Sequence, residues 1–423
     1  MVLKSAFTII LLVWFTFSSH AEEGQPPSLQ LREIIEEALE KNPEIMAAKN
    51  QWEAARERIP QASSLDDPVL SYTYLGRRVE TRVGPQRNRL GISQKFPFFG
   101  KLSLRREIAS QGAQRARELH EAKKLEIVAK VKSAYYWIFM IHKAIQINQE
   151  NVEILRRFAR IAEIKYATGK VSQQDVLKAQ VELSDLANDL ITLGQEKETA
   201  EAALNVLLDR APQAPLGAPG EAERRPFADT LESLQQMATE RQPLLKALQA
   251  AIDKSKAALA LEHRKYYPDF TLGVNYIEVK GGTTLSRDDG KDSLLFTVRL
   301  NIPLWADRLR AGVQEAQADV NRNKARYRAM RNKILFDVKD SFVKVQTAGR
   351  LVDLFKTTIL PLAEQSLEAA TIGYQADKVD FLNLLESQRV IQNFQLDYYR
   401  ALVSYEQRLA DLERTVGVDL VSR

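Results

Sequence analysis

Cysteine is absent from the 423-residue chain, which excludes disulfide bonds, thiolate zinc sites, a catalytic thiol and a lipidated cysteine. Proline and glycine are scarce, at 15 and 18 residues, so a fold of short strands and many turns is disfavoured and helix should dominate. The net charge of +5 is spread among residues of both signs and gives no basis for nucleic-acid binding. After residue 21 no apolar run reaches the roughly 18 residues of a transmembrane helix, which leaves a β-barrel contribution open.

Motifs of catalysis and metal binding are also missing. The chain has no nucleophile elbow, no phosphate-binding glycine loop and no His-Glu-x-x-His pattern. Beyond the first 21 residues the histidines are His120, His142 and His263, which lack the spacing of metal ligands. We therefore expect ordinary helix-surface histidines, no cofactor, no metal site and no enzymatic activity.

Residues 1–21 have the three parts of a secretory signal peptide. Lys4 supplies the positive charge, residues 6–17 form a short apolar segment, and Ser19-His20-Ala21 is a small-x-small cleavage site. The sequence therefore predicts an exported protein.

The prolines show that the chain is a tandem duplication. Three pairs recur at a separation of about 200 residues, namely Pro43 with Pro243, Pro68 with Pro268, and Pro97 with Pro303. Repeat one is expected over residues 29–210 and repeat two over residues 227–417. The linker between them, residues 211–226, contains four prolines and two glycines. This period indicates a duplicated domain, because solenoid units repeat every 20–50 residues.

A heptad pattern predicts very long helices in each repeat. Apolar and small residues step by four and three positions from Ile127 to Tyr166, and again from Ile334 to Gly373, which is typical of a left-handed supercoil. Repeat one should contain helices over about 101–168 and 172–209, and repeat two over about 307–374 and 380–414. At 1.5 Å per residue the longer helix of each repeat would span roughly 100 Å.

Four segments alternate between apolar and polar residues and predict strands, at about 68–76, 88–97, 269–277 and 292–302. Leu272, Val274 and Tyr276, for example, alternate with Gly273 and Asn275. Gln94 is the exception on the apolar face. A period of two over about ten residues is typical of outer-membrane barrel strands, and a half-buried soluble sheet is the alternative.

Aromatic residues favour the membrane alternative, because they gather at the strand ends nearest the helices, where a membrane-interface girdle would lie. They are Phe96, Phe98, Phe99, Tyr266, Tyr267 and Trp305. The opposite strand ends lead into polar segments, 77–87 and 278–292, that are expected to be extracellular loops. Because about eight strands are the minimum for a barrel, four strands per chain imply a shared barrel of eight strands from two chains or twelve from three.

Together these features resemble the TolC family of outer-membrane efflux proteins. The resemblance rests on the signal peptide, the duplicated plan of strand hairpins and long helices, the run Phe96-Pro97-Phe98-Phe99-Gly100-Lys101, and the helix turn from Tyr374 to Gln388. It implies a homotrimer with a twelve-stranded barrel in the outer membrane and a helical tunnel through the periplasm. It also implies docking onto a periplasmic adaptor and an inner-membrane pump. The segments around Pro361 and 379–382 are most similar to the branch that partners resistance-nodulation-division pumps, including heavy-metal exporters of the CusC and CzcC kind.

The expected fold is mainly α with a β-barrel contribution, and the expected function is passive export of heavy-metal ions or small toxic molecules. A pore-free periplasmic coiled-coil adaptor or scaffold would also explain the heptads and the signal peptide. A duct for type I protein secretion would share the whole plan. Only a duct explains four alternating strands flanked by aromatic residues.

The resemblance also places a periplasmic gate at the turn from residue 374 to 387. Its candidate residues are Tyr374, Asn383, Glu386, Asp175 and Lys378. Asn383 and Glu386 stand where the family has two acids, and Val379 stands where it has a link-forming arginine that Lys378 would replace. Asp377 occupies the position of a turn glycine, which repeat one keeps as Gly169. In a trimer, three copies of Glu386 would narrow the pore and favour cations.

Overall fold

The computed structural model of the protein describes residues 28–225, 227–282 and 284–420. The predicted signal peptide at residues 1–21 lies outside these ranges. The helices of the first half are α1 (Leu31–Lys41), α2 (Pro43–Ser63), α3 (Lys101–Ala167) and α4 (Gln173–Leu207). Those of the second half are α5 (Leu231–Arg241), α6 (Pro243–Arg264), α7 (Ala306–Leu354), the π-helical segment η1 (Phe355–Ile359), α8 (Leu360–Gln375) and α9 (Phe381–Val416). The strands are β1 (Val69–Val79), β2 (Gln86–Phe96), β3 (Phe270–Val279) and β4 (Ser293–Leu300).

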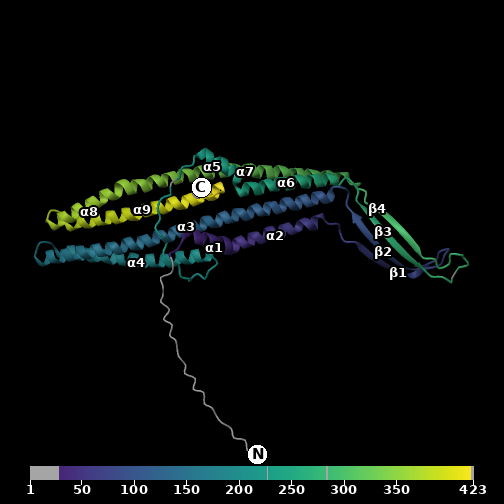
Figure 1. Ribbon diagram of the computed structural model, residues 1–423, viewed down its shortest axis with the longest axis horizontal. Helices are drawn as coiled ribbons and strands as arrows, with labels where there is room; N and C mark the ends of the chain where they lie inside the picture. Colours follow the sequence, from purple (N-terminus) through teal and green to yellow (C-terminus); the bar gives the residue numbers. More distant parts are fainter. Residues whose placement is uncertain (1–27, 226, 283, 421–423) are drawn as a thin grey trace, which may run out of the picture.

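The molecule is strongly elongated (Figure 1). The four strands lie at one end, and the α3–α4 and α8–α9 turns lie together at the other. Helix α3, 67 residues long, runs the whole length between these ends and packs against α2 and α6 on the side of the sheet and against α4 and α9 on the side of the turns. Helices α1 and α5 lie near the middle.

The two halves join their helices end to end by the same device. The side chain of Asn42 accepts hydrogen bonds from the first backbone N–H groups of α2 and donates one to Leu207 O, at the end of α4, at 2.9 Å. Gln242 does the same for α6, and donates to Arg414 O and Thr415 O at the end of α9 at 3.0 and 2.6 Å. Because each side chain satisfies one helix start and one helix end, α4 continues into α2 and α9 into α6 as nearly unbroken columns.

The helix expected over 307–374 is interrupted, so the prediction of one continuous α-helix is wrong in its interior. The five residues of η1 form a π-helical turn directly before α8, whose second residue is Pro361. Proline has no N–H to donate, and its ring would collide with the carbonyl four residues earlier. A wider turn relieves that collision, as π turns inside α-helices commonly do.

The strand boundaries also differ from the expected ones. Strand β1 extends to Val79 and β2 begins at Gln86, so the connecting loop is shorter than the 77–87 segment. Strand β4 ends at Leu300, before Pro303, rather than at 302. The sequence patterns predict no element where helices α1, α2, α5 and α6 lie, because these residues lack the long heptad pattern.

The buried core follows the helical columns in two clusters. The larger surrounds the middle of α3, where Ile127, Val131 and Ile138 are fully buried, and the smaller lies near the turns around Phe381 and Leu384. None of the helices in the described ranges has the combination of length and hydrophobicity that a membrane crossing requires.

Candidate channel wall and tip

The sheet presents one broad apolar face to its surroundings. The strands are antiparallel in the order β1-β2-β3-β4, and their register aligns Leu70, Ile92, Val274 and Phe296 in one row across all four. Leu70 is 70% exposed and Phe296 73% exposed. Adjacent rows add Tyr72, Leu90, Tyr276 and Leu294, and then Leu272 and Val298. An exposed apolar surface of this extent marks a face that meets lipid or another protein.

The opposite face is mostly polar, although Val69, Ile277 and Leu295 also lie on it. One row brings Ser71, Gly91 and Asn275 together, and the Ser71 hydroxyl donates to Gly91 O at 3.3 Å. The amide of Asn275 donates to Thr297 Oγ1 at 3.3 Å. The alternation predicted from the sequence thus separates two chemically distinct faces, which is the pattern of a sheet between lipid and water.

Gln94, the polar exception on the apolar face, uses its amide group to bind backbone. Its Nε2 donates to Asp66 O at 2.7 Å and to Lys95 O at 2.9 Å. Asp66 lies just before β1, so Gln94 ties the start of β1 to the end of β2. A polar side chain is tolerated here because its donors are satisfied within the protein.

The two edges of the sheet are open. Strands β1 and β4 each pair on one side only within the described chain. An unpaired edge exposes a row of backbone N–H and C=O groups that can add a further strand. Edges next to an exposed apolar face are suited to pairing with other copies of the sheet.

Most of the predicted girdle aromatics form one cluster where the strands meet the helices. Phe98 stacks on Tyr267 with ring centroids 4.7 Å apart, and Phe96 stacks on Phe270 at 5.5 Å. Phe99 leans against both Phe98 and Phe270 and is 76% exposed. Tyr266 and Trp305 are exposed at the same junction and contact no other ring within the described ranges. Amphipathic and aromatic side chains in this position suit a membrane–water boundary.

Asp269 fixes the geometry of this junction. Its Oδ1 lies 2.6 Å from Nζ of the buried Lys101, at the first residue of α3, and accepts from Phe98 N at 2.9 Å. Lys101 also donates to Tyr267 O at 2.9 Å. The ion pair therefore locks the direction in which α3 leaves the sheet.

At the other end of the molecule, Tyr374 is the centre of the tip cluster. It is 2% exposed and packs against Phe381, and Lys165 Nζ lies 4.4 Å from the centre of its ring. Burial, reinforced by the carboxylates of Asp175 and Asp377, raises the pKa of Tyr374 to about 12, so the phenol is neutral near pH 7. The structure thus brings the predicted residues Tyr374 and Asp175 together.

Two lysines that the sequence interpretation missed join this cluster. Asp377 adopts φ 56°, a left-handed conformation that glycine favours, and its carboxylate pairs with Lys165 and with Lys170, the latter at 3.2 Å. Hydrogen bonds from Lys165 and then Lys170 lower the pKa of Asp377. Lys165 lies in the last turn of α3 and Lys170 in the turn that follows it, so these pairs connect the two repeats at this end of the molecule. In the sequence, the only indication of a role for Lys165 and Lys170 is that they lie at the repeat-one counterpart of the turn that contains Asp377.

The remaining predicted gate residues lie apart from this cluster on exposed positions. Asn383 and Glu386 lie on the exposed side of α9, and Lys378 lies in the turn before it and forms no ion pair with any described residue. The buried side of α9 carries Gln388, which donates to Asn151 of α3. Their role in a constriction stays a prediction.

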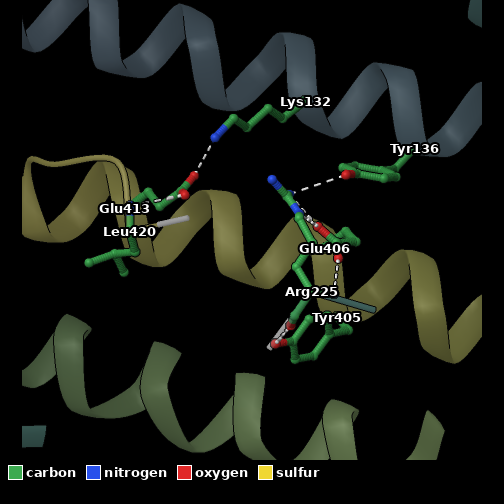
Figure 2. A network of polar contacts seen from close by, with 7 residues as sticks. All are labelled: Lys132, Tyr136, Arg225, Tyr405, Glu406, Glu413 and Leu420. Atoms are coloured by element: carbon green, nitrogen blue, oxygen red, sulfur yellow. Dashed lines mark hydrogen bonds and ion pairs between the residues drawn. The ribbon is translucent and has the colours of Figure 1, made fainter. Parts of the chain in front are cut away.

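A buried polar network ties the linker to α3 and α9 near the middle of the molecule (Figure 2). Glu406 is fully buried, and its Oε2 accepts from Arg225 Nε at 3.1 Å, while Arg225 also donates to the Tyr136 hydroxyl at 3.2 Å. The Tyr405 hydroxyl in turn donates to Arg225 O at 2.7 Å. The linker is therefore bound to the helices through Arg225, which its proline and glycine content did not predict.

A second buried pair lies beside it in the same view. Lys132 Nζ of α3 is 2.5 Å from Glu413 Oε2 of α9, and both side chains are almost fully buried. Burial raises the pKa of Glu413, and Lys132 opposes this shift. Glu406 and Glu413 are one heptad apart on α9, and acids at that spacing on a buried helix face are the signal that could have predicted the network.

Metal-binding residues do not cluster in the described ranges, where no group of three or more His, Cys, Asp or Glu could hold a metal ion. The expectation of surface histidines is wrong for His120, which is buried and stacked on Trp52 at 6.0 Å. Burial lowers the pKa of His120, so the ring is a neutral packing element.

Comparison with known proteins connects this architecture to a family. The outer membrane efflux protein family matches residues 34–210 and 234–418. The cobalt-zinc-cadmium resistance protein CzcC of Cupriavidus metallidurans is 24% identical over 393 residues, covering 92% of this chain and 90% of the relative. Nodulation protein T of Rhizobium leguminosarum bv. trifolii is 21% identical, covering 97% and 88% of the two chains.

Solved structures share the fold over nearly the whole chain. A crystal structure of CusC superposes with a TM-score of 0.79 at 18% identity, covering 93% of both chains. The outer membrane protein VceC of Vibrio cholerae gives 0.76 at 19% identity, covering 92% of this chain and 97% of its own.

The family match covers both halves of the duplication and includes the long helices, the strands and both turns. It confirms the resemblance to the TolC family of the CusC and CzcC kind, and the relatives are channel proteins rather than enzymes. The chain therefore belongs to the outer membrane efflux protein family, and it is the outer-membrane channel component of an efflux system.

Proposed function

We propose that three copies of the chain form a passive export duct, with twelve strands closing a barrel in the outer membrane and the helices forming a tunnel in the periplasm. The observation that carries this proposal is a four-stranded sheet with one exposed apolar face and two open edges. Four strands cannot close, and joining β4 of one copy to β1 of the next removes both edges. The family resemblance favours three copies over two.

The orientation follows from the two ends of the sheet. The aromatic cluster marks the boundary with the periplasm, and the loops at the other end face outward. These loops support each other, since Lys280 N donates to Pro85 O at 3.0 Å and Gly290 N donates to Val83 O at 2.7 Å. The predicted signal peptide fits export across the inner membrane.

The tip is the proposed gate and the site of docking to a periplasmic adaptor and an inner-membrane pump. In a trimer the exposed Asn383 and Glu386 would line a narrow pore, one helical turn apart. Tyr374 and Asp175 would hold the turn of α8 and α9 in place, and Lys378 is free to reach a neighbouring copy. The ion pairs of Asp377 with Lys165 and Lys170 hold the ends of the two repeats together within each copy, which supports a closed gate.

The proposed cargo is divalent heavy-metal cations. This rests on the similarity to CzcC, whose name records resistance to cobalt, zinc and cadmium. A duct does not need to retain its cargo, so a cluster of metal ligands in its wall is not required.

The absence of cysteine makes assembly directly testable. The test uses double-cysteine variants with one cysteine on β1 and one on β4. Because β4 of one copy would lie beside β1 of the next, a disulfide should form between copies where the two Cα atoms approach within about 7 Å. After oxidation of outer membranes, we expect a ladder on denaturing gels that ends at three chains. Matched cysteine pairs on β1 and β3, which are separated by β2, should give none. A ladder ending at two chains, or protein in the soluble periplasmic fraction, would overturn the proposal.

The cargo is tested separately by deleting the gene and restoring it. We expect the deletion strain to become more sensitive to cobalt, zinc and cadmium, and the wild-type chain to restore tolerance. Unchanged tolerance together with an intact trimer would reject metal cations as cargo and leave the duct standing.

A further inference from the structure

We propose that the barrel wall is the anion-preferring section of the duct, and that Arg89, Lys95 and Arg299 determine this specificity. The inference rests on the proposed trimeric channel. It assigns to the barrel an electrostatic character opposite to that expected of Glu386 at the tip.

The register places all three basic residues on the polar face of the sheet. Arg89 lies in one cross-strand row with Thr73 and Ile277. Lys95 and Arg299 lie in another row, on either side of Thr271. Because successive side chains of a strand point to opposite faces, these residues face away from the apolar surface, and therefore into the lumen of a closed barrel.

The basic side chains are not neutralised within the chain. Arg89 and Arg299 are exposed and form no ion pair with any described residue. Lys95 Nζ lies 3.8 Å from Asp269 Oδ2, but Asp269 is already paired with the buried Lys101 at 2.6 Å. Two lysines thus share one carboxylate, which leaves a net positive charge at this row.

No acid lies on the polar face between the two basic rows, because Glu278 of β3 alternates with Ile277 onto the other face, in register with Asn88. The positions on this face between the two basic rows are all uncharged, and they are Val69, Ser71, Gly91, Ser93, Gly273, Asn275, Leu295 and Thr297. With their connecting loops, residues 69–96 and 269–301 contain ten Lys and Arg against six Asp and Glu. The wall therefore carries two positive tiers, separated by the six residues from Arg89 to Lys95, or roughly 20 Å.

Two positive tiers around a pore attract anions and repel cations. Multivalent anions entering from outside should be held between the tiers, where small side chains leave room. External divalent cations should be excluded from the barrel. A cation delivered by a pump would pass the acidic tip first and would then meet the positive tiers, which raise the barrier to its passage in either direction, so its outward movement would depend on the pump.

The test uses purified full-length protein in planar bilayers with citrate added on the side of the loops. A trivalent anion about 10 Å from three arginines, at about 0.1 M salt, should bind about tenfold more weakly when those arginines are neutralised. We therefore expect Arg89→Gln, and separately Arg299→Gln, to raise the half-blocking citrate concentration about tenfold. Arg89→Lys keeps the charge and should behave as wild type. The matched control is Arg287→Gln, which removes an exposed arginine from a loop outside the strands.

Two outcomes separate this inference from the proposed function. If wild-type protein forms trimeric channels but Arg89→Gln and Arg299→Gln keep its citrate sensitivity, the anion-preferring wall is refuted. If wild-type protein forms no channels, the trimeric duct itself fails. If a variant does not assemble, the test uses the wild-type channel alone. Channel block should then increase from acetate to sulfate to citrate, because the charge of the anion increases in that order. Equal block by all three anions would overturn the inference.

Discussion

Neighbouring residues on β4 offer a direct test of which face of the sheet meets lipid. Val298 lies on the apolar face in register with Leu272, and Thr297 lies on the polar face in register with Gly273. Arginine on the lipid face costs about 2–4 kcal/mol at the bilayer midplane and about 0–1 kcal/mol near the interface. Val298→Arg should therefore impair assembly, whereas Thr297→Arg should be tolerated.

The depth of each residue sets the size of the effect. Val298 is two residues, or about 7 Å, from the periplasmic end of β4, so its cost should lie between the interface and midplane values, at about 1–3 kcal/mol per chain. Phe296 lies in the middle of the strand, and Phe296→Arg should approach the midplane value. Because a trimer contains three copies, each cost is incurred three times in assembly.

The assay is folding into lipid vesicles across a denaturant series, supported by the heat resistance of the trimer on gels. We expect the loss of stability to rank Phe296→Arg above Val298→Arg and both well above Thr297→Arg. Phe296→Ala controls for the loss of the ring without a charge. Equal effects of arginine at 297 and 298 would show that the sheet does not separate lipid from water, and the assignment of its faces would be wrong.

Three further predictions concern residues outside the sheet. Glu386→Gln should lower the cation selectivity of the channel, and identical reversal potentials for wild type and variant in a salt gradient would remove Glu386 from the constriction. Arg225→Met should destabilise the protein by about 3–5 kcal/mol because it leaves the buried Glu406 carboxylate unpaired, and adding Glu406→Leu should recover most of this loss in chemical unfolding. Burial raises the pKa of Glu413 above 4.5 in the folded state, so the folded protein favours the protonated form of this carboxyl group. The resulting contribution to stability is fully present below about pH 4.5 and is lost as the pH rises through the folded pKa. Glu413→Gln should therefore flatten the profile of melting temperature against pH, and a profile parallel to that of wild type would contradict this.

Local patterns in the sequence predicted the features that depend on local rules. Alternation along Leu272 to Tyr276 predicts a two-faced strand, because the period of two is a property of the extended backbone. The heptad pattern predicts the long helices because a seven-residue repeat is likewise a local property, that of supercoiled α-helices. The spacing of Pro43 and Pro243 predicts the duplication, and both prolines begin equivalent helices, α2 and α6.

Features that depend on contacts between distant residues could not be predicted. The pairing of Arg225 with Glu406 joins a linker to a helix 181 positions away, and no periodicity relates them. His120 is buried because Trp52 of α2 covers it, although its own helix pattern placed it on the surface. The π-helical segment η1 could not be predicted because the heptad pattern around it favours a continuous α-helix. The only sign of it in the sequence is Pro361, whose ring disturbs the preceding helical turn.

The turns at the tip show how the two repeats have become different while keeping one backbone path. Gly169 in repeat one and Asp377 in repeat two occupy equivalent positions, and both adopt positive φ, at 73° and 56°. Glycine adopts this conformation without a steric penalty, whereas aspartate tolerates it and brings a carboxylate. In this chain the carboxylate of Asp377 reaches Lys165 and Lys170 of the other repeat. Any displacement of the α8–α9 turn away from the α3–α4 turn must therefore separate charges that a glycine at position 377 would not have joined.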